Sequence, residues 1–183
     1  MSQPNEAVRQ VLQKFQDGYT ARDVTRLDEF MELFAPDDDI ELIGIGAGAR
    51  GEREWFQGRN AIREIIESDW RYWGDVVIDV PAAQITVRGE VAWLSVTAGL
   101  LKSAEFDAAL NVYLEQMKGI LDNANLPVEN RLVEAIYFGA DRIRDIKKAV
   151  GHRWPLVITG VLVKVDGNWR FHTLHWAMPV GNG

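Results

Sequence analysis

The chain has 183 residues, a formal net charge of −7 and 47% hydrophobic residues. This length fits one domain with a sizeable core, and the acidic balance argues against a nucleic-acid partner, because a basic face is needed to neutralise phosphates. The sequence contains no cysteine, which excludes disulfides, thiolate chemistry and cysteine-based zinc sites. It shows neither a signal-peptide pattern nor an apolar run near the ~20 residues of a membrane span, so we expect a soluble, cytoplasmic protein without a membrane partner.

The first hundred residues show the periodicities of a mixed helical and strand structure. Apolar residues spaced three and four apart indicate amphipathic helices, and short β-branched runs bounded by Gly or Pro indicate strands. The pattern predicts helices over 8–19 and 27–34, a strand over 40–45, a helix from Asn60 to Trp70, a strand over 75–80 and a hairpin over 84–100.

Residues 102–152 carry two further amphipathic stretches on either side of Leu126-Pro127. They predict a helical hairpin between two strands that would otherwise be neighbours in a sheet. Two helices cannot build a core of their own. We therefore interpret residues 102–152 as an insertion in a single domain that spans residues 1–183.

The C-terminal segment predicts a second strand hairpin, with runs 156–165 and 168–177 flanking Asp166-Gly167. Asp-Gly between strand-like runs favours a type I′ turn, in which both central residues have positive φ. Helices followed by an antiparallel sheet make an α+β fold.

Four groups of residues, taken together, resemble the nuclear transport factor 2-like superfamily, and its SnoaL-like branch (ketosteroid-isomerase and polyketide-cyclase-like proteins) in particular. They are Leu33–Asp38, Gly58–Ile62, Val91–Trp93, and Val163–Arg170 continuing through His175 to Pro179. The resemblance implies a cone-shaped curved antiparallel sheet wrapped around the N-terminal helices, with an apolar cavity at its open end. It also implies a homodimer formed through the outer face of the sheet. The resemblance leaves out residues 102–152.

The acids used by the best-known enzymes of this superfamily are missing from the matching positions. The ketosteroid-isomerase tyrosine falls on Phe15, its base on Ile43 or Gly44, and its second acid on Val161. The epoxide-hydrolase aspartate falls near Leu174. Both mechanisms are therefore disfavoured, whereas the paired histidines of dehydratase-like members have two counterparts in the last hairpin.

A two-residue turn at Asp166-Gly167 sets the expected register of that hairpin. It would pair Val163 with Arg170, Val161 with His172, and Val157 with Trp176. The residues then expected to face the cavity are Arg170, His172, Leu174 and Trp176, and those on the outer face are Trp169, Phe171, Thr173 and His175. A three-residue loop with a bulge would exchange these roles, because a slip of one residue turns every side chain over.

His172 is the first catalytic candidate, as a general acid or base that titrates near neutrality. The alternative is a core histidine hydrogen-bonded to a neighbouring carbonyl. Glu41, on the same strand face as Ile43, is its candidate partner, or else a solvent-facing acid. The three acids 37–39 and the glycines of 44–51 lack metal or nucleotide-binding spacing, so we expect no metal and no cofactor.

Two functions remain open. The first is the binding of a small, mostly apolar molecule in the cone, with cofactor-free acid–base chemistry. The second is a non-catalytic dimeric or assembly module in which the insertion covers the cone or contacts a partner. The expected ligand-binding residues are Phe15, Tyr19, Phe34, Ile43, Trp70, Trp73, Val161, Arg170, Leu174 and Trp176.

Overall fold

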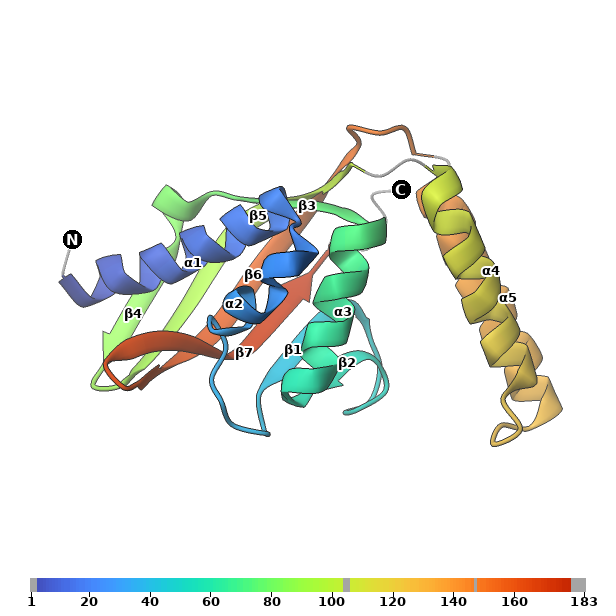
Figure 1. Cartoon of the computed structure of the whole chain (residues 1–183), viewed down its shortest axis with the longest axis horizontal. Helices are drawn as coiled ribbons and strands as arrows, with labels where there is room; N and C mark the ends of the chain where they lie inside the picture. Colours follow the sequence, from blue (N-terminus) through green and yellow to red (C-terminus); the bar gives the residue numbers. More distant parts are fainter. Residues whose placement is uncertain (1–2, 104–105, 147, 179–183) are drawn as a thin grey trace.

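The computed structural model describes residues 3–103, 106–146 and 148–178 (Figure 1). It confirms the α+β fold. In chain order, the elements are α1 (Gln3–Ala21), the short helix η1 (Val24–Arg26), α2 (Leu27–Met31), β1 (Glu41–Ala47), β2 (Arg53–Gln57), α3 (Gly58–Tyr72), β3 (Gly74–Ile78), the short helix η2 (Val80–Ala82), β4 (Gln84–Arg88), β5 (Val91–Lys102), α4 (Phe106–Asp122), α5 (Val128–Ile146), β6 (Arg153–Val165) and β7 (Asn168–Ala177).

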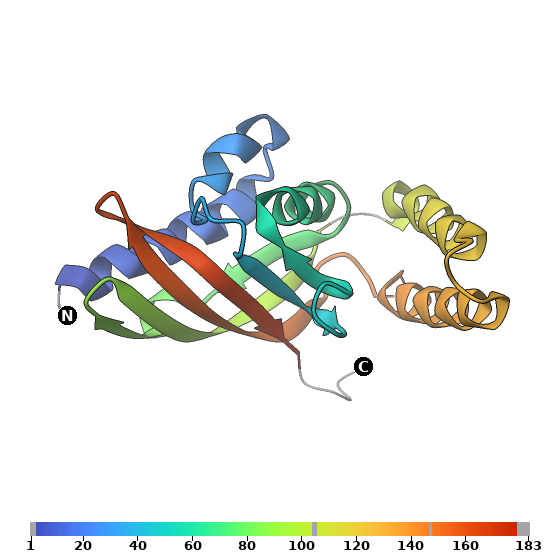
Figure 2. The ribbon, with the colours of Figure 1, turned by 90° about the horizontal axis from the view of Figure 1, so that it is seen from below.

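The strands form one mixed sheet in the order β2-β1-β7-β6-β5-β3, and β4 also pairs with β5. Strands β1 and β7 run parallel, and the other pairs are antiparallel. The sheet is strongly curved, and α1, α2 and α3 lie on one of its faces, leaving the other face uncovered (Figures 1 and 2). Strand β2 has no counterpart among the predicted elements, because its sequence lacks a regular apolar alternation.

The inside of the curved sheet is filled by an aromatic cluster around α1. Phe15 is fully buried, and its ring lies 5.0–6.4 Å from five other aromatic rings. These rings belong to Tyr19, Phe30, Phe34, Phe171 and Trp176. Such contacts add to the free energy gained by burying the rings. The cluster fills the space between α1 and the inner face of the sheet with aromatic rings.

The last hairpin keeps the predicted turn but not the predicted register beyond it. Asp166 and Gly167 have φ values of 50° and 83°, as a type I′ turn requires. The pairing of Val163 with Arg170 is confirmed, whereas Val161 pairs with Thr173. His172 is therefore the extra residue of a β-bulge. The pairings predicted for Val161 and Val157 are wrong because this bulge lies within the strand rather than at the turn.

The bulge changes which residues of β7 point inward. Before it, Trp169 and Phe171 are buried, although an outward position was predicted for both. After it, Leu174 and Trp176 are buried, as predicted, while His175 is exposed. A bulge shifts the inward–outward alternation of side chains by one residue. The strand therefore buries Trp169 and Phe171 before the bulge and Leu174 and Trp176 after it.

The α4–α5 hairpin leaves the sheet between β5 and β6 and stands beside the cone (Figure 1). β5 and β6 are nevertheless paired along most of their length, from Val91–Val163 to Leu101–Arg153. Within the described part of the chain, no helix is both long enough and apolar enough to cross a lipid bilayer.

Candidate functional site

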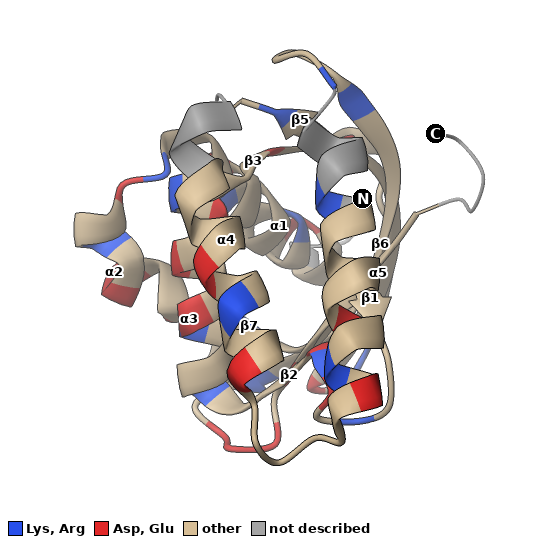
Figure 3. Cartoon of the chain, turned by 90° about the vertical axis from the view of Figure 1, so that its right-hand side faces the viewer, with Lys and Arg blue, Asp and Glu red and all other residues tan. Residues whose placement is uncertain are grey.

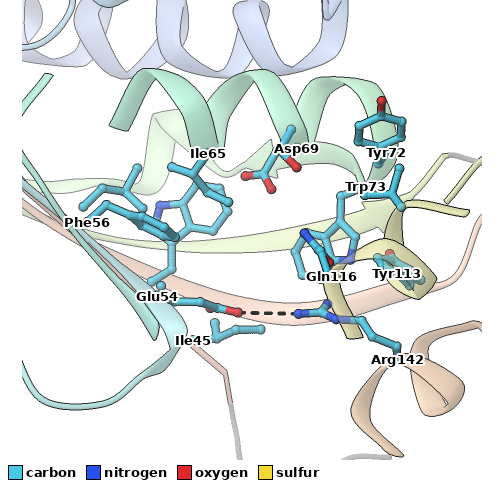
Figure 4. A pocket seen from close by; sticks show the side chains of 15 residues that line it. Ile45, Glu54, Phe56, Ile65, Asp69, Tyr72, Trp73, Tyr113, Gln116 and Arg142 are labelled. Atoms are coloured by element: carbon cyan, nitrogen blue, oxygen red, sulfur yellow. Dashed lines mark ion pairs between the residues drawn. The ribbon is translucent and has the colours of Figure 1, made fainter. Parts of the chain in front are cut away.

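A cavity of about 110 Å³ lies at the rim of the cone, between β1, β2, α3 and the α4–α5 hairpin (Figure 4). Its wall is mainly apolar and aromatic, and a few polar groups converge on it. The polar lining residues are Glu54, Ser68, Asp69, Gln116 and Arg142, and the larger apolar ones include Leu42, Phe56, Ile65, Trp73 and Trp176. An apolar cavity with few polar groups is the usual form of a small-molecule site.

Asp69 is the acid on the α3 side of this cavity. Its Oδ2 atom accepts a hydrogen bond from the Tyr19 hydroxyl at 3.1 Å. Burial raises the pKa of the Asp69 carboxyl to about 7; the Tyr19 hydrogen bond lowers it, the nearby Glu54 charge raises it, and Arg142 lowers it. The side chain keeps some exposed surface, but the surrounding protein disfavours its charge strongly enough for burial to dominate.

Tyr19 holds Asp69 from the neighbouring helix α1. Burial, followed by the Asp69 charge and hydrogen bond, raises the pKa of the Tyr19 phenol well above its usual value. Tyr19 therefore remains a neutral hydrogen-bond donor at physiological pH. It fixes the position of a carboxyl that is near half-protonation at neutral pH, the state that suits a general acid or base.

Glu54 provides a second carboxylate from β2, and the sequence of β1 makes room for it. The Gly46 amide donates a hydrogen bond to Glu54 Oε2 at 2.8 Å. A Cβ atom at Gly44 would lie only 2.5 Å from the same oxygen, so a side chain there would displace the carboxylate. Two of the glycines of segment 44–51, Gly44 and Gly46, therefore serve to position Glu54.

Arg142 on α5 closes the cavity from the hairpin side. Its guanidinium lies 3.9 Å from Glu54 Oε1, and Figure 4 shows the two side chains facing each other across the pocket. The same guanidinium lies 5.5 Å from the centroid of the Tyr113 ring and 5.3 Å from that of Phe138. The insertion thus contributes both a cation and aromatic surface to the site.

The two predicted catalytic residues lie outside this cavity. His172 contacts Thr173 Oγ1 at 3.1 Å and Asp39 at 3.3 Å. Glu41 accepts hydrogen bonds from Arg50 at 2.9 Å and Gln57 at 3.3 Å. The expectation that both face the cavity is therefore corrected. Strand β6 turns Leu162 rather than Val161 inward, so Phe171 and not His172 is buried, and β1 directs Leu42, not Glu41, inward.

The structure distributes the predicted ligand-binding residues over three places. Trp73 and Trp176 line the cavity. Buried behind it in the core lie Phe15, Tyr19, Phe34, Trp70 and Leu174. The other three do not face the cavity: Val161 is exposed, Ile43 pairs beside the exposed His175, and Arg170 forms an ion pair with Glu32 at 3.3 Å.

Arg170 instead borders a separate groove of about 800 Å³ between α1, α2 and the β6–β7 turn. This groove is larger than the rim cavity, but its wall mixes solvated charges of both signs, including Lys14, Arg26 and Glu29. The pKa of Arg26 is raised and that of Glu29 lowered mainly by their mutual hydrogen bond, with both side chains solvated rather than buried. The rim cavity is therefore the stronger candidate for chemistry.

The sequence contained one signal for Asp69 that the prediction did not use. Asp69 lies four residues after Ile65 and seven after Ile62, so it belongs to the apolar stripe of α3. A carboxylate on the buried side of a helix is unusual and indicates a partner or a function. Glu54 and Arg142 had no comparable signal, because only the folded chain brings β2 and α5 together. Among the described residues, no cluster of three or more His, Asp or Glu could hold a metal ion.

Three solved structures of the nuclear transport factor 2-like or cystatin-like fold resemble the whole chain. A proposed dehydratase of the NTF2-like family from Streptomyces avermitilis has a TM-score of 0.59 at 11% identity, covering 96% of each chain. An NTF2-like superfamily protein from Salmonella enterica has a TM-score of 0.58 at 13% identity, covering 98% of this chain and 96% of its own. An NTF2-like protein from Novosphingobium aromaticivorans has a TM-score of 0.57 at 12% identity, covering 97% and 83%. These likenesses show the fold.

Comparison of the sequence with curated proteins gives no match. The family model of the SnoaL-like domain matches residues 8–120, from the first helix to the end of α4. This match spans more than half of the chain and agrees with the resemblance found in the sequence. The protein therefore belongs to the SnoaL-like domain family.

Proposed function

We propose that the protein binds a small, largely apolar molecule in the rim cavity and transfers a proton to or from it through Asp69. The observation that carries this proposal is the position of the Asp69 carboxyl, which lines an aromatic pocket and accepts a hydrogen bond from the buried Tyr19 hydroxyl; burial there raises its pKa to about 7. Such a group exchanges protons readily at neutral pH. The solved NTF2-like relative named as a proposed dehydratase is compatible with acid–base chemistry, but its low identity transfers no substrate.

The surrounding residues suggest how a ligand would be held. Trp73 and Trp176 offer flat apolar surfaces, and the Trp176 indole nitrogen is buried without an acceptor among the described residues. A ligand carbonyl or hydroxyl oxygen would satisfy that donor. The Glu54–Arg142 pair then closes the opposite side, so the hairpin acts as a cover that excludes water from the bound molecule.

A ligand panel tests the binding step. Compounds near the size of one aromatic ring, such as phenols and cyclic ketones, match a cavity of about 110 Å³ and are screened together with larger steroids, polyketides and terpenoids. The readout is stabilisation against thermal unfolding, since a ligand bound to the folded state raises Tm by mass action. Binding in the rim cavity predicts that Trp73→Ala weakens each hit, while the control Trp93→Ala, on the outer sheet face, does not. A panel without hits, or hits unaffected by Trp73→Ala, would contradict the proposal.

Proton transfer is tested separately on the ligands that bind. NMR in deuterated water follows exchange of the carbon-bound protons next to a ligand carbonyl. We expect exchange with the unmodified protein and a loss of at least ~100-fold with Asp69→Asn, the usual scale of general acid–base catalysis. Binding without Asp69-dependent exchange would favour the second function, a non-catalytic binding module, which the aromatic filling of the deep cone also supports.

We also propose that the uncovered sheet face forms a homodimer. Four apolar side chains on this face are exposed: Val91, Trp93, Val157 and Val161. Trp93 and Val161 are direct cross-strand partners, so they form one continuous apolar patch. A patch of this kind on a sheet is typical of an interface. The domain organisation we propose keeps residues 1–183 as one unit, with the hairpin inserted between β5 and β6.

A further inference from the structure

The α4–α5 hairpin carries apolar residues that the described part of the chain leaves exposed. Among the hairpin residues whose burial is described, only Ala135 and Gly139 are buried. Helices in proteins are stabilised mainly by packing of an apolar face, and two helices alone provide little of it. Seven large apolar side chains of the hairpin are 43–70% exposed, namely Leu114, Leu121, Val128, Leu132, Val133, Ile136 and Tyr137.

The contacts of α5 with the cone determine which way these residues point. Glu134 binds Arg53 at 3.2 Å, and Arg142 binds Glu54 at 3.9 Å, so one side of α5 faces β2. At 3.6 residues per turn, Val128, Leu132 and Ile136 form a stripe on the side away from Glu134. This stripe therefore faces outward.

The contacts between α4 and α5 place the exposed leucines of α4 beside that stripe. Arg131 on α5 donates a hydrogen bond to the backbone carbonyl oxygen of Leu121 at 3.1 Å, which holds the end of α4 against α5. Leu114 lies seven residues earlier and therefore on the same side of α4. Figure 3 looks at the hairpin from its outward side and shows α4 and α5 side by side in front of the cone.

We propose that this outward face packs against the same face of a second copy of the chain, so that two hairpins form an intermolecular four-helix bundle. A two-fold axis supplies each apolar stripe with an equal partner stripe, and four amphipathic helices can enclose a core that two cannot. The charged residues near the face include Glu115, Lys118 and Glu129, of both signs, so like charges do not oppose the contact.

The exposed area fits such a contact. Six of the seven exposed side chains can share the outward face, because Tyr137 lies nine residues after Val128 and so on the opposite side of α5. Six side chains of this size, about half exposed, present on the order of 100 Å² each, so two copies would bury on the order of 1,200 Å². Stable protein interfaces bury about 1,200–2,000 Å². The bundle is distinct from the contact proposed for the outer sheet face, which involves β5 and β6 and no hairpin residue.

The test measures the mass of the full chain in solution by size-exclusion chromatography with light scattering at low micromolar concentration. The variant Leu132→Asp/Ile136→Asp places charges on the outward face, where both side chains are exposed enough to leave the fold intact. Asn130→Asp adds a charge to an exposed position on another side of α5 and is the control. Trp93→Glu disrupts the outer sheet face, and circular dichroism verifies that each variant is folded.

We expect the Leu132→Asp/Ile136→Asp variant to have half the mass of the unmodified protein and Asn130→Asp to leave the mass unchanged. If the sheet face also forms a dimer, Trp93→Glu halves the mass independently and the combined variant is a monomer. An unmodified protein that is monomeric, or a hairpin variant of unchanged mass, would overturn the proposal. If the hairpin variant, Trp93→Glu and their combination all give one and the same reduced mass, the hairpin contacts the partner's sheet instead, which also overturns it.

Discussion

The cone and the hairpin are built from similarly amphipathic segments, but they end in opposite states. In the cone, Phe15, Phe34 and Phe171 are fully buried in one continuous aromatic core. In the hairpin, residues of the same kind, such as Ile136 and Tyr137, are mostly exposed. An apolar stripe therefore shows that a helix needs a partner surface without showing whether its own chain provides that surface.

The cavity lies where these two regions meet. The cone contributes Asp69 and Glu54, and the hairpin contributes Arg142. Among the described residues, the ion pairs Arg53–Glu134 and Glu54–Arg142 join the hairpin to β2, and no hairpin side chain belongs to the buried core of the cone. Exposed or half-exposed ion pairs contribute little free energy, so we expect the hairpin to open far more readily than the cone unfolds.

The largest expected effect is a difference between the cone and the hairpin in how much free energy of unfolding is lost when one aromatic side chain is truncated. Phe171→Ala should lower the free energy of unfolding by about 3–5 kcal/mol, because it leaves a cavity in the aromatic core. Tyr137→Ala should change it by less than about 0.5 kcal/mol in dilute, monomeric protein, because its side chain is largely exposed. Urea unfolding measures both, and equal losses would show that the hairpin belongs to the same core.

The second prediction concerns the pH dependence that Asp69 gives to the cone. Its pKa of about 7 lies above the ~3.9 of an unfolded aspartate, so the folded state binds more protons between these values. Its contribution to stability is therefore greatest below about pH 4, falls as the pH rises towards 7, and stays low above it. Asp69→Asn removes this dependence and leaves an oxygen that can accept the Tyr19 hydrogen bond.

We expect Asp69→Asn to match the unmodified protein near pH 4 and to exceed its unfolding free energy at pH 8 by about 1–3 kcal/mol. The three-unit shift sets an upper limit of about 4 kcal/mol, which solvent in the cavity reduces. Denaturant unfolding at both pH values measures the difference. A difference that does not vary between pH 4 and pH 8 would show that the Asp69 carboxyl titrates normally.

The smallest expected effect concerns the contact between β2 of the cone and α5 of the hairpin. Glu54→Gln removes the ion pair with Arg142 and should raise the amide hydrogen-exchange rate of α5 about twofold, since such pairs contribute about 0.5 kcal/mol. Gly44→Ala should act in the same direction by displacing the Glu54 carboxylate. The control Glu52→Gln alters an exposed neighbouring acid, and its exchange rates should remain unchanged. If Glu52→Gln also raised the exchange rate of α5, the general negative charge near β2, rather than the specific Glu54–Arg142 ion pair, would be what holds the hairpin.

Much of the fold could be predicted because periodicity and turn chemistry act locally. The buried stripe of α1 through Phe15 and Tyr19 and the turn at Asp166-Gly167 follow from spacing and from φ preference. The bulge at His172 could not be predicted in this way, because no local residue preference requires it. The extra residue shifted only the pairings beyond it, from Val161–Thr173 onward. Phe171 and Arg170 were misplaced because Val161, taken as cavity-facing, is exposed, whereas Leu162 is buried.

The sequence by itself determined the family, the α+β class, the helical nature of residues 106–146 and the apolar stripes that need partners. The tertiary structure alone decided the site. It brings Asp69 from α3, Glu54 from β2 and Arg142 from α5 to one cavity and places Tyr19 of α1 behind Asp69, although up to 123 positions separate these residues in the chain. A pKa shift arises from burial and from charges close in space, and neither can be read from neighbours in sequence.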